Sequence, residues 1–148
     1  MSLPHVFNAV VGAGIVAPGS GGVAGSNPAV NTVTGAANNV DEGSSLTINV
    51  ATTDCADGTV LNWSINHVSS SSGDFGTNSG TVTITSNAGS FTVTPSADLT
   101  TEGAETFTVT VSGNVGGTSV SSTSASITIN DTSLDPPTPT YAIVKNFG

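Results

Sequence analysis

The run from Glu105 to Val111 is Glu-Thr-Phe-Thr-Val-Thr-Val, in which every second residue from Phe107 onward is large and apolar. In an extended chain successive side chains point to opposite faces, so Phe107, Val109 and Val111 share one face and the threonines share the other. Threonine favours strands and suits a solvent-facing side. The run therefore predicts a β-strand with one buried face.

Runs with the same period of two occur on both sides of this stretch. Clusters of Gly, Asn, Asp and Ser separate them, with about 8 to 15 residues from one strand to the next. This spacing, together with outer faces of Ser and Thr, predicts an all-β protein built as a two-sheet antiparallel sandwich of about seven strands. The other predicted strands are Ser45–Ala51, Thr59–His67, Thr81–Thr85, Phe91–Pro95 and Ala125–Ile129, with a seventh near Asn31–Val40.

Two turn clusters indicate how some of these strands connect. Asn87-Ala88-Gly89 lies between the runs at Thr81–Thr85 and Phe91–Pro95, which predicts that these two runs form a hairpin. Gly113–Gly117 predicts a turn after the strand that begins at Glu105.

The alternation also predicts which side chains form the core. Trp63 lies in phase with Leu61 and Ile65, so we expect a core tryptophan rather than a ligand platform. Cys55 has no second cysteine to pair with, and we expect a buried free thiol, the alternative being an exposed thiol that joins two copies. The predicted inward-facing residues are Leu46, Ile48, Val50, Leu61, Trp63, Ile65, Val82, Ile84, Phe91, Val93, Phe107, Val109, Val111, Ile127 and Ile129.

The two ends of the chain differ in composition from the middle. Residues 1–36 are uncharged and rich in small residues, which predicts an extended arm, either laid along a neighbouring subunit or acting as a linker. The sandwich is predicted over 37–132, and 133–148 is a Pro-rich spacer followed by a strand-like peptide suited to β-augmentation or to an edge of its own sandwich. The residues predicted to contact partners are Val10, Val11, Ile15, Val16, Tyr141, Ile143, Val144 and Phe147.

The charge of the chain is one-sided. Ten acidic residues face a single basic one, Lys145, and the net charge is −9. Such a chain repels a phosphate backbone, so nucleic acid is not an expected partner. The carboxylates need counter-ions from outside the protein, either a divalent cation or water and salt.

Other classes of function lack their expected sequence features. Gly and Pro interrupt every apolar run, so membrane insertion is not expected, and the start of the chain lacks the pattern of a secretion signal. His5 and His67 have no catalytic pattern around them, and the nucleophile-elbow, phosphate-loop and zinc-protease motifs are absent from the sequence. We therefore do not expect an enzyme.

Several segments resemble Calx-β domains, the immunoglobulin-like modules of sodium/calcium exchangers and of many bacterial and phage surface proteins. The resemblance covers about residues 38–132. It implies an immunoglobulin-like sandwich with extended arms. The segments that carry it are Val40–Gly43, Asp74–Phe75, Gly80–Ile84, Phe91–Pro95 with Asp98, Glu102–Val109 and Ile127–Asp131.

The same resemblance implies a calcium site at one end of the sandwich. In calcium-binding members, acidic residues supply the oxygens that Ca²⁺ prefers. The strong binders carry doubled acids where this chain has single ones, and the alternative is that Asp98 and Glu102 accept backbone N–H bonds in their loop. The matching residues are Glu42, Asp98, Glu102, Glu105 and Asp131.

These features predict a structural protein. The first hypothesis is a bacteriophage virion component, such as a head decoration, tail or fibre-associated protein, displayed on the virion surface and bound to other subunits or to itself through its ends. The alternative is a calcium-stiffened module of a bacterial surface adhesin or extracellular filament, for which only one copy of the motif is present.

Overall fold

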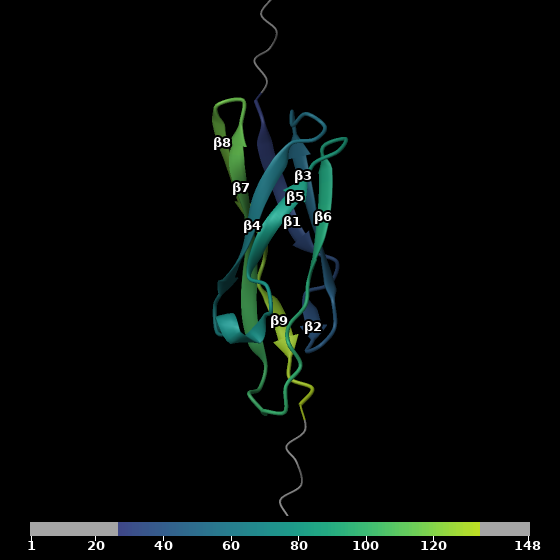
Figure 1. The fold of residues 1–148 in the computed structure, drawn as a ribbon, viewed down its shortest axis with the longest axis vertical. Coiled ribbons are helices and arrows are strands. Elements are labelled where there is room, and N and C mark those ends of the chain that lie inside the picture. The colour runs from purple at the N-terminus through teal and green to yellow at the C-terminus, as the bar shows by residue number, and fades with distance from the viewer. Residues whose placement is uncertain (1–26, 134–148) are drawn as a thin grey trace, which may run out of the picture.

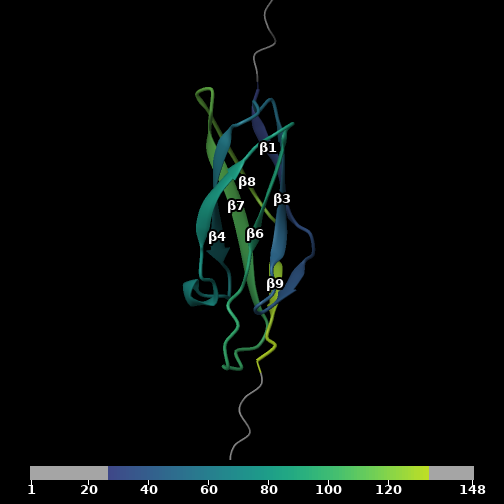
Figure 2. The same cartoon turned by 45° about the vertical axis from the view of Figure 1, so that its right-hand side comes forward.

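Nine strands build two sheets in the computed structural model, which describes residues 27–133 (Figure 1). The two sheets lie face to face, and the view turned by 45° separates the layer of β3 from the layer of β4 (Figure 2). The smaller sheet has the order β1-β3-β6, and all its pairs are antiparallel. Its strands are β1 (Ala29–Gly35), β3 (Leu46–Thr53) and β6 (Ala88–Val93).

The larger sheet has the order β2-β9-β7-β4-β5, and β8 also pairs with β7. The predicted all-β, two-sheet immunoglobulin-like fold is therefore confirmed. One pair departs from the antiparallel prediction, because β2 runs parallel to β9. The strands of this sheet are β2 (Asn39–Asp41), β4 (Val60–His67), β5 (Ser79–Thr83), β7 (Glu105–Val115), β8 (Thr118–Thr123) and β9 (Ile127–Asn130).

The long strand β7 has two successive partners along one edge. Its start pairs with β9, and its later part pairs with β8. Between these partners Ser124 bonds twice to Val109, since the Val109 N–H donates to the Ser124 hydroxyl at 2.9 Å and the Ser124 N–H donates to the Val109 carbonyl at 2.8 Å. The sequence did not predict β8, because Val120 is the only buried residue of that strand.

The N-terminal boundary predicted at residue 36 is wrong. Residues 29–35, assigned from sequence to the arm, form β1, which pairs with β3 and buries Val30 and Val33 in the core between the sheets. A register shift between Val30 and Thr32 interrupts the period of two there, which hid the strand. The seventh strand predicted near Asn31–Val40 is in fact two strands, β1 and β2, in different sheets.

The turn predicted between β5 and β6 is present, but the two strands do not pair with each other as a hairpin. Ser86 and Asn87 both have positive φ, 52° and 59°, and Thr85 and Ala88 exchange two backbone hydrogen bonds across them. This is the geometry of a type I′ turn, which asparagine tolerates. The strands that follow separate, because β5 pairs with β4 and β6 pairs with β3.

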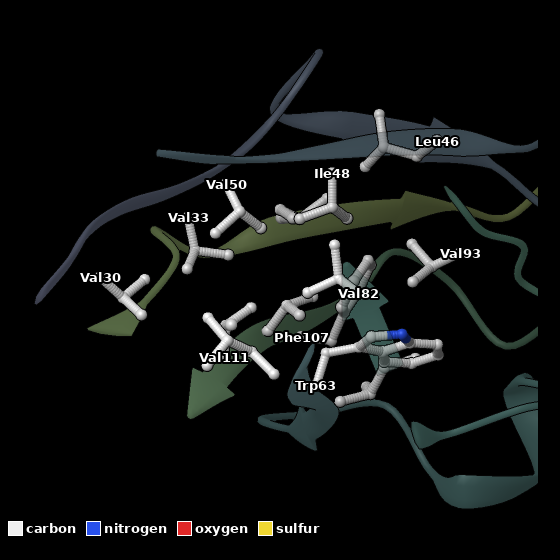
Figure 3. Close-up of a cluster of buried hydrophobic side chains, with 14 of the residues drawn as sticks. Val30, Val33, Leu46, Ile48, Val50, Trp63, Val82, Val93, Phe107 and Val111 are labelled. Carbon is white, nitrogen blue, oxygen red and sulfur yellow. The ribbon is translucent and has the colours of Figure 1, made fainter. Parts of the chain in front are cut away.

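The predicted core is confirmed almost completely (Figure 3). Every predicted inward residue is buried except Phe91, which is partly buried, and Cys55 is a buried free thiol. Trp63 is 7% exposed and stacks on Phe91 with ring centroids 4.6 Å apart. The residues of the hydrophobic core cluster that the sequence missed are Val30, Val33, Val40, Phe75 and Val120.

The described chain begins and ends at opposite poles of the sandwich. β1 starts at the top of Figure 1, whereas the segment after β9 leaves at the bottom, beside the loop that leads into β7. The only helix in residues 27–133 is the short 3₁₀ turn η2 (Ser72–Asp74), and no described helix has the length and hydropathy to cross a bilayer.

Candidate functional site

Three carboxylates meet at the lower pole of the sandwich. Asp74 ends η2, Glu102 belongs to the loop before β7, and Glu105 begins β7. One oxygen of each lies within 4.8 Å of the others. The sequence predicted Glu102 and Glu105 for this site but not Asp74, which comes from the distant connection between β4 and β5.

Local hydrogen bonds hold Asp74 in place. The Ser71 and Asp74 residues form a capping box, in which the Ser71 side chain accepts from the Gly73 N–H and the Ser71 hydroxyl donates to Asp74 at 2.9 Å. Burial raises the pKa of Asp74, but the Ser71 hydrogen bonds, the contact with Glu105 and the nearby His67 outweigh it and lower the pKa below its usual value. Asp74 is therefore an ionised member of the cluster.

Glu105 has the opposite tendency. Burial, a hydrogen bond with Asp74 and the charges of Asp74, Glu102 and Glu42 together raise the pKa of Glu105 to about 7. The pKa of Glu102 is raised as well, by desolvation first and then by its acidic neighbours. At neutral pH the Glu105 carboxyl is therefore partly protonated.

The other three predicted ligands are held by protein groups at the same pole. Asp131 accepts the N–H groups of Glu102, Gly103 and Ser133 at 2.8, 2.8 and 2.9 Å, and these bonds lower its pKa. Glu42 accepts the Ser133 hydroxyl at 2.9 Å.

Asp98 accepts the Thr100 N–H at 2.6 Å. The alternative prediction of a backbone-bonded loop is therefore correct for Asp98, and the structure adds Asp131 to it. We call the six residues Glu42, Asp74, Asp98, Glu102, Glu105 and Asp131 the acidic pole.

A groove opens beside this pole. It has a volume of about 470 Å³, and Trp63 and Val93 line it together with the hydroxyl-bearing residues Thr77, Thr92 and Ser96. The residues Gly43 and Ala97, next to Glu42 and Asp98, also line it. The sequence missed the groove, because it arises where the edges of the two sheets separate.

His67 has a structural contact rather than a catalytic one. Its Nδ1 atom lies 2.9 Å from the Ser70 hydroxyl, three residues away along the chain, and Ser70 is buried. The contact closes the loop after β4. The predicted partner-contact residues Val10, Val11, Ile15, Val16, Tyr141, Ile143, Val144 and Phe147 lie outside the described residues.

Comparison with known proteins identifies the family of the sandwich. Residues 26–130 match the family model described as "Bacterial Ig domain", which covers most of the chain and includes β1. This match supports the corrected N-terminal boundary. It shows a bacterial Ig domain and does not extend to the narrower Calx-β resemblance. No curated protein matches the chain.

Proposed function

The chain belongs to the bacterial Ig domain family, and from this premise we propose that it is a non-catalytic structural module of a bacteriophage virion, displayed on the particle and attached through its terminal segments. The family's fold serves many functions, so the argument has to come from the features of this chain.

The placement of the chain ends is the observation that carries this proposal. β1 enters the sandwich at one pole, and the segment after β9 leaves at the other (Figure 1). Residues 1–25 precede the matched domain and residues 131–148 follow it. A module with attachments at both poles suits a spacer or display unit between two contacts, because each attachment leaves the long sides of the sandwich accessible.

Immunogold electron microscopy tests the proposal. Antibodies raised against the purified chain are applied to concentrated phage particles and to intact cells from the same culture. Gold at regular positions on particles is the expected result. Gold on cell surfaces alone favours a surface filament or adhesin, and a protein found only in the soluble cell extract contradicts a structural role in either assembly.

The acidic pole supports a second candidate function, a module stiffened by calcium. Asp74, Glu102 and Glu105 are close enough for their oxygens to contact one cation, and residues 27–133 contain no Lys or Arg to neutralise them. Binding only to the folded state would stabilise it. The Calx-β resemblance around Glu102–Val109 also predicts calcium binding at this end of the sandwich.

Thermal unfolding of the full chain in CaCl₂ and in chelator tests this candidate. We expect the Tm to rise by several degrees, about 1 kcal/mol or more of binding free energy, when calcium is in large excess over its Kd. The Glu102→Gln variant should lose this rise. Asp57→Asn, which removes a charge from the loop between β3 and β4, should keep it, and equal Tm values with and without calcium in the unmodified protein would end the calcium hypothesis.

A further inference from the structure

The outer edge of β6 has backbone groups that no described strand pairs with. β6 is the last strand of its sheet within residues 27–133. The Thr52 N–H donates to the Asn87 carbonyl, whereas the N–H and C=O of Ala88 bond to Thr85 on the other side. In an antiparallel ladder these directions alternate, so Ser90 and Thr92 present their N–H and C=O groups to the open edge. The open stretch ends before Ser96, whose N–H donates to the Asp74 carbonyl at 2.7 Å. Within these limits the edge is a template for a short added strand.

The groove beside this edge has an apolar floor that an added strand could cover. Trp63 points from β4 into the space between the sheets (Figure 3). Its ring stacks on that of Phe91 in β6, with the centroids 4.6 Å apart. Its ring lies over Gly80 of β5, where an added Cβ would come within 2.8 Å of the indole. The glycine lets the indole lie at the open side of the sandwich, where it lines the groove.

One end of the groove meets the acidic pole. Gly43 and Ala97 line the groove and adjoin Glu42 and Asp98. The Ser133 hydroxyl lies within hydrogen-bond distance of two acceptors, a Glu42 carboxylate oxygen at 2.9 Å and the Asp98 carbonyl oxygen at 2.7 Å. An occupant of the groove would therefore have apolar side chains near Trp63 and a positive charge near the carboxylates.

The C-terminal peptide of the chain has this chemistry. Residues 141–147 are Tyr-Ala-Ile-Val-Lys-Asn-Phe, which contain the only Tyr and the only basic residue of the protein. In an extended strand Tyr141, Ile143, Lys145 and Phe147 share one face. Three prolines at 136, 137 and 139 separate this peptide from Ser133, and such a spacer favours an extended path of about 3.1 Å per residue. A spacer of this composition favours docking on a second copy over a return to the groove of the same copy.

We propose that residues 141–147 of one copy of this chain dock as an added strand on the open edge of β6 in a second copy, with Lys145 beside the acidic pole. The inference rests on the proposed structural function and identifies one of its partners as the protein itself. Because the donor and acceptor surfaces differ, the contact is head-to-tail and extends to a filament or closes to a ring.

Sedimentation velocity of the full chain over a range of concentrations tests the contact. We expect concentration-dependent association, weakened about tenfold or more by Ile143→Asp, which places a carboxylate against the indole and the acidic pole. Thr138→Asp adds the same charge in the spacer and should change the association by less than about twofold. Both positions lie outside the described residues, and a melting curve of each variant checks that the fold persists.

The acceptor edge and the charge contact have tests of their own. Thr92→Pro removes an N–H from the open edge, where a proline is tolerated, and should prevent association while a melting curve shows that the fold persists. Lys145→Glu should weaken association, Lys145→Arg should retain it, and high salt should weaken it in the unmodified chain.

Trp63 is the only tryptophan, so its emission reports on the groove. The protein could stay monomeric at every concentration while Ile143→Asp changes the Trp63 emission. That result would mean that the peptide occupies the groove of its own copy, and it would overturn the second-copy proposal. A monomer with unchanged emission would also overturn it. Neither result affects gold labelling of particles, so the proposed virion role is tested separately.

Discussion

At the scale of single residues, Glu105 is the group whose raised pKa makes the stability of the fold depend on pH near neutrality. Its pKa is raised to about 7 from a usual value of 4.5. Between these values the folded state holds a proton that the unfolded chain has released, so the stability that this group contributes is lost as the pH rises through about 7. The effect is opposite in sign to that of Asp131, whose lowered pKa favours the folded state above pH 3.8.

We predict that Glu105→Gln, which carries no charge at any pH, melts higher than the unmodified protein at pH 8 and close to it at pH 5. Thermal unfolding followed by circular dichroism at both pH values measures this difference. Asp57→Asn serves as the control for loss of a negative charge away from the acidic pole, because the asparagine side-chain oxygen can still accept the Ser86 N–H that Asp57 accepts at 2.6 Å. The same Tm difference at pH 5 and pH 8 would contradict a titrating Glu105.

Gly80 offers a second prediction at this scale. A methyl group there would meet the Trp63 ring at 2.8 Å, so we expect Gly80→Ala to lower the free energy of unfolding by about 1 to 3 kcal/mol. Gly76→Ala is the matched control, because nothing lies within 4 Å of its added Cβ. Urea unfolding followed by Trp63 fluorescence compares the two, and equal midpoints would show that the indole can move aside without cost.

At the scale of elements, the turn at Ser86–Asn87 couples strands of both sheets. The Asn87 carbonyl oxygens, from backbone and side chain, accept the Thr52 and Cys55 N–H groups at 2.9 and 3.0 Å. Asn87 also has a φ of 59°, which glycine adopts more readily than alanine. The residue therefore combines a conformational role with a hydrogen-bonding one.

Two substitutions separate these roles. Asn87→Gly keeps the backbone conformation and loses the side-chain bond, and we expect a loss of stability of about 1 kcal/mol. Asn87→Ala loses both, and we expect a further loss of about 1 kcal/mol. Chemical denaturation measures both. If the two variants have the same stability, the positive φ contributes nothing.

The comparison of elements shows what a period of two can reveal. It identified β3, β4 and β7, where one face is buried without interruption. It missed β8, which buries only Val120, and it merged β1 with β2, because a register shift breaks the alternation in β1. It also could not place β5 and β6 in different sheets, because a two-residue turn has the same sequence whether the strands stay together or separate.

The candidate site was predictable to a similar extent. Glu102 and Glu105 lie close together in sequence and were expected together. Asp74 joins them only because η2 and the start of β7 meet at the same pole, which depends on the pairing of β4 with β7. Asp131 and Glu42 were expected as ligands, yet backbone N–H groups and Ser133 use their oxygens, and sequence patterns do not show such long-range bonds.

At the scale of the whole molecule, the parallel pair of β2 and β9 has a mechanical consequence. The chain enters through β1 at one end and leaves after β9 at the other, so tension between the ends draws β2 and β9 past each other along their length. All rungs of this pair then bear the load together. The start of β1 and the Ser86–Asn87 turn lie at the same end of the smaller sheet. Pulling between them would instead open the backbone pairs of the β1-β3-β6 sheet one at a time. Single-molecule pulling should therefore require the larger force in the first geometry, where forced unfolding is limited by a high barrier.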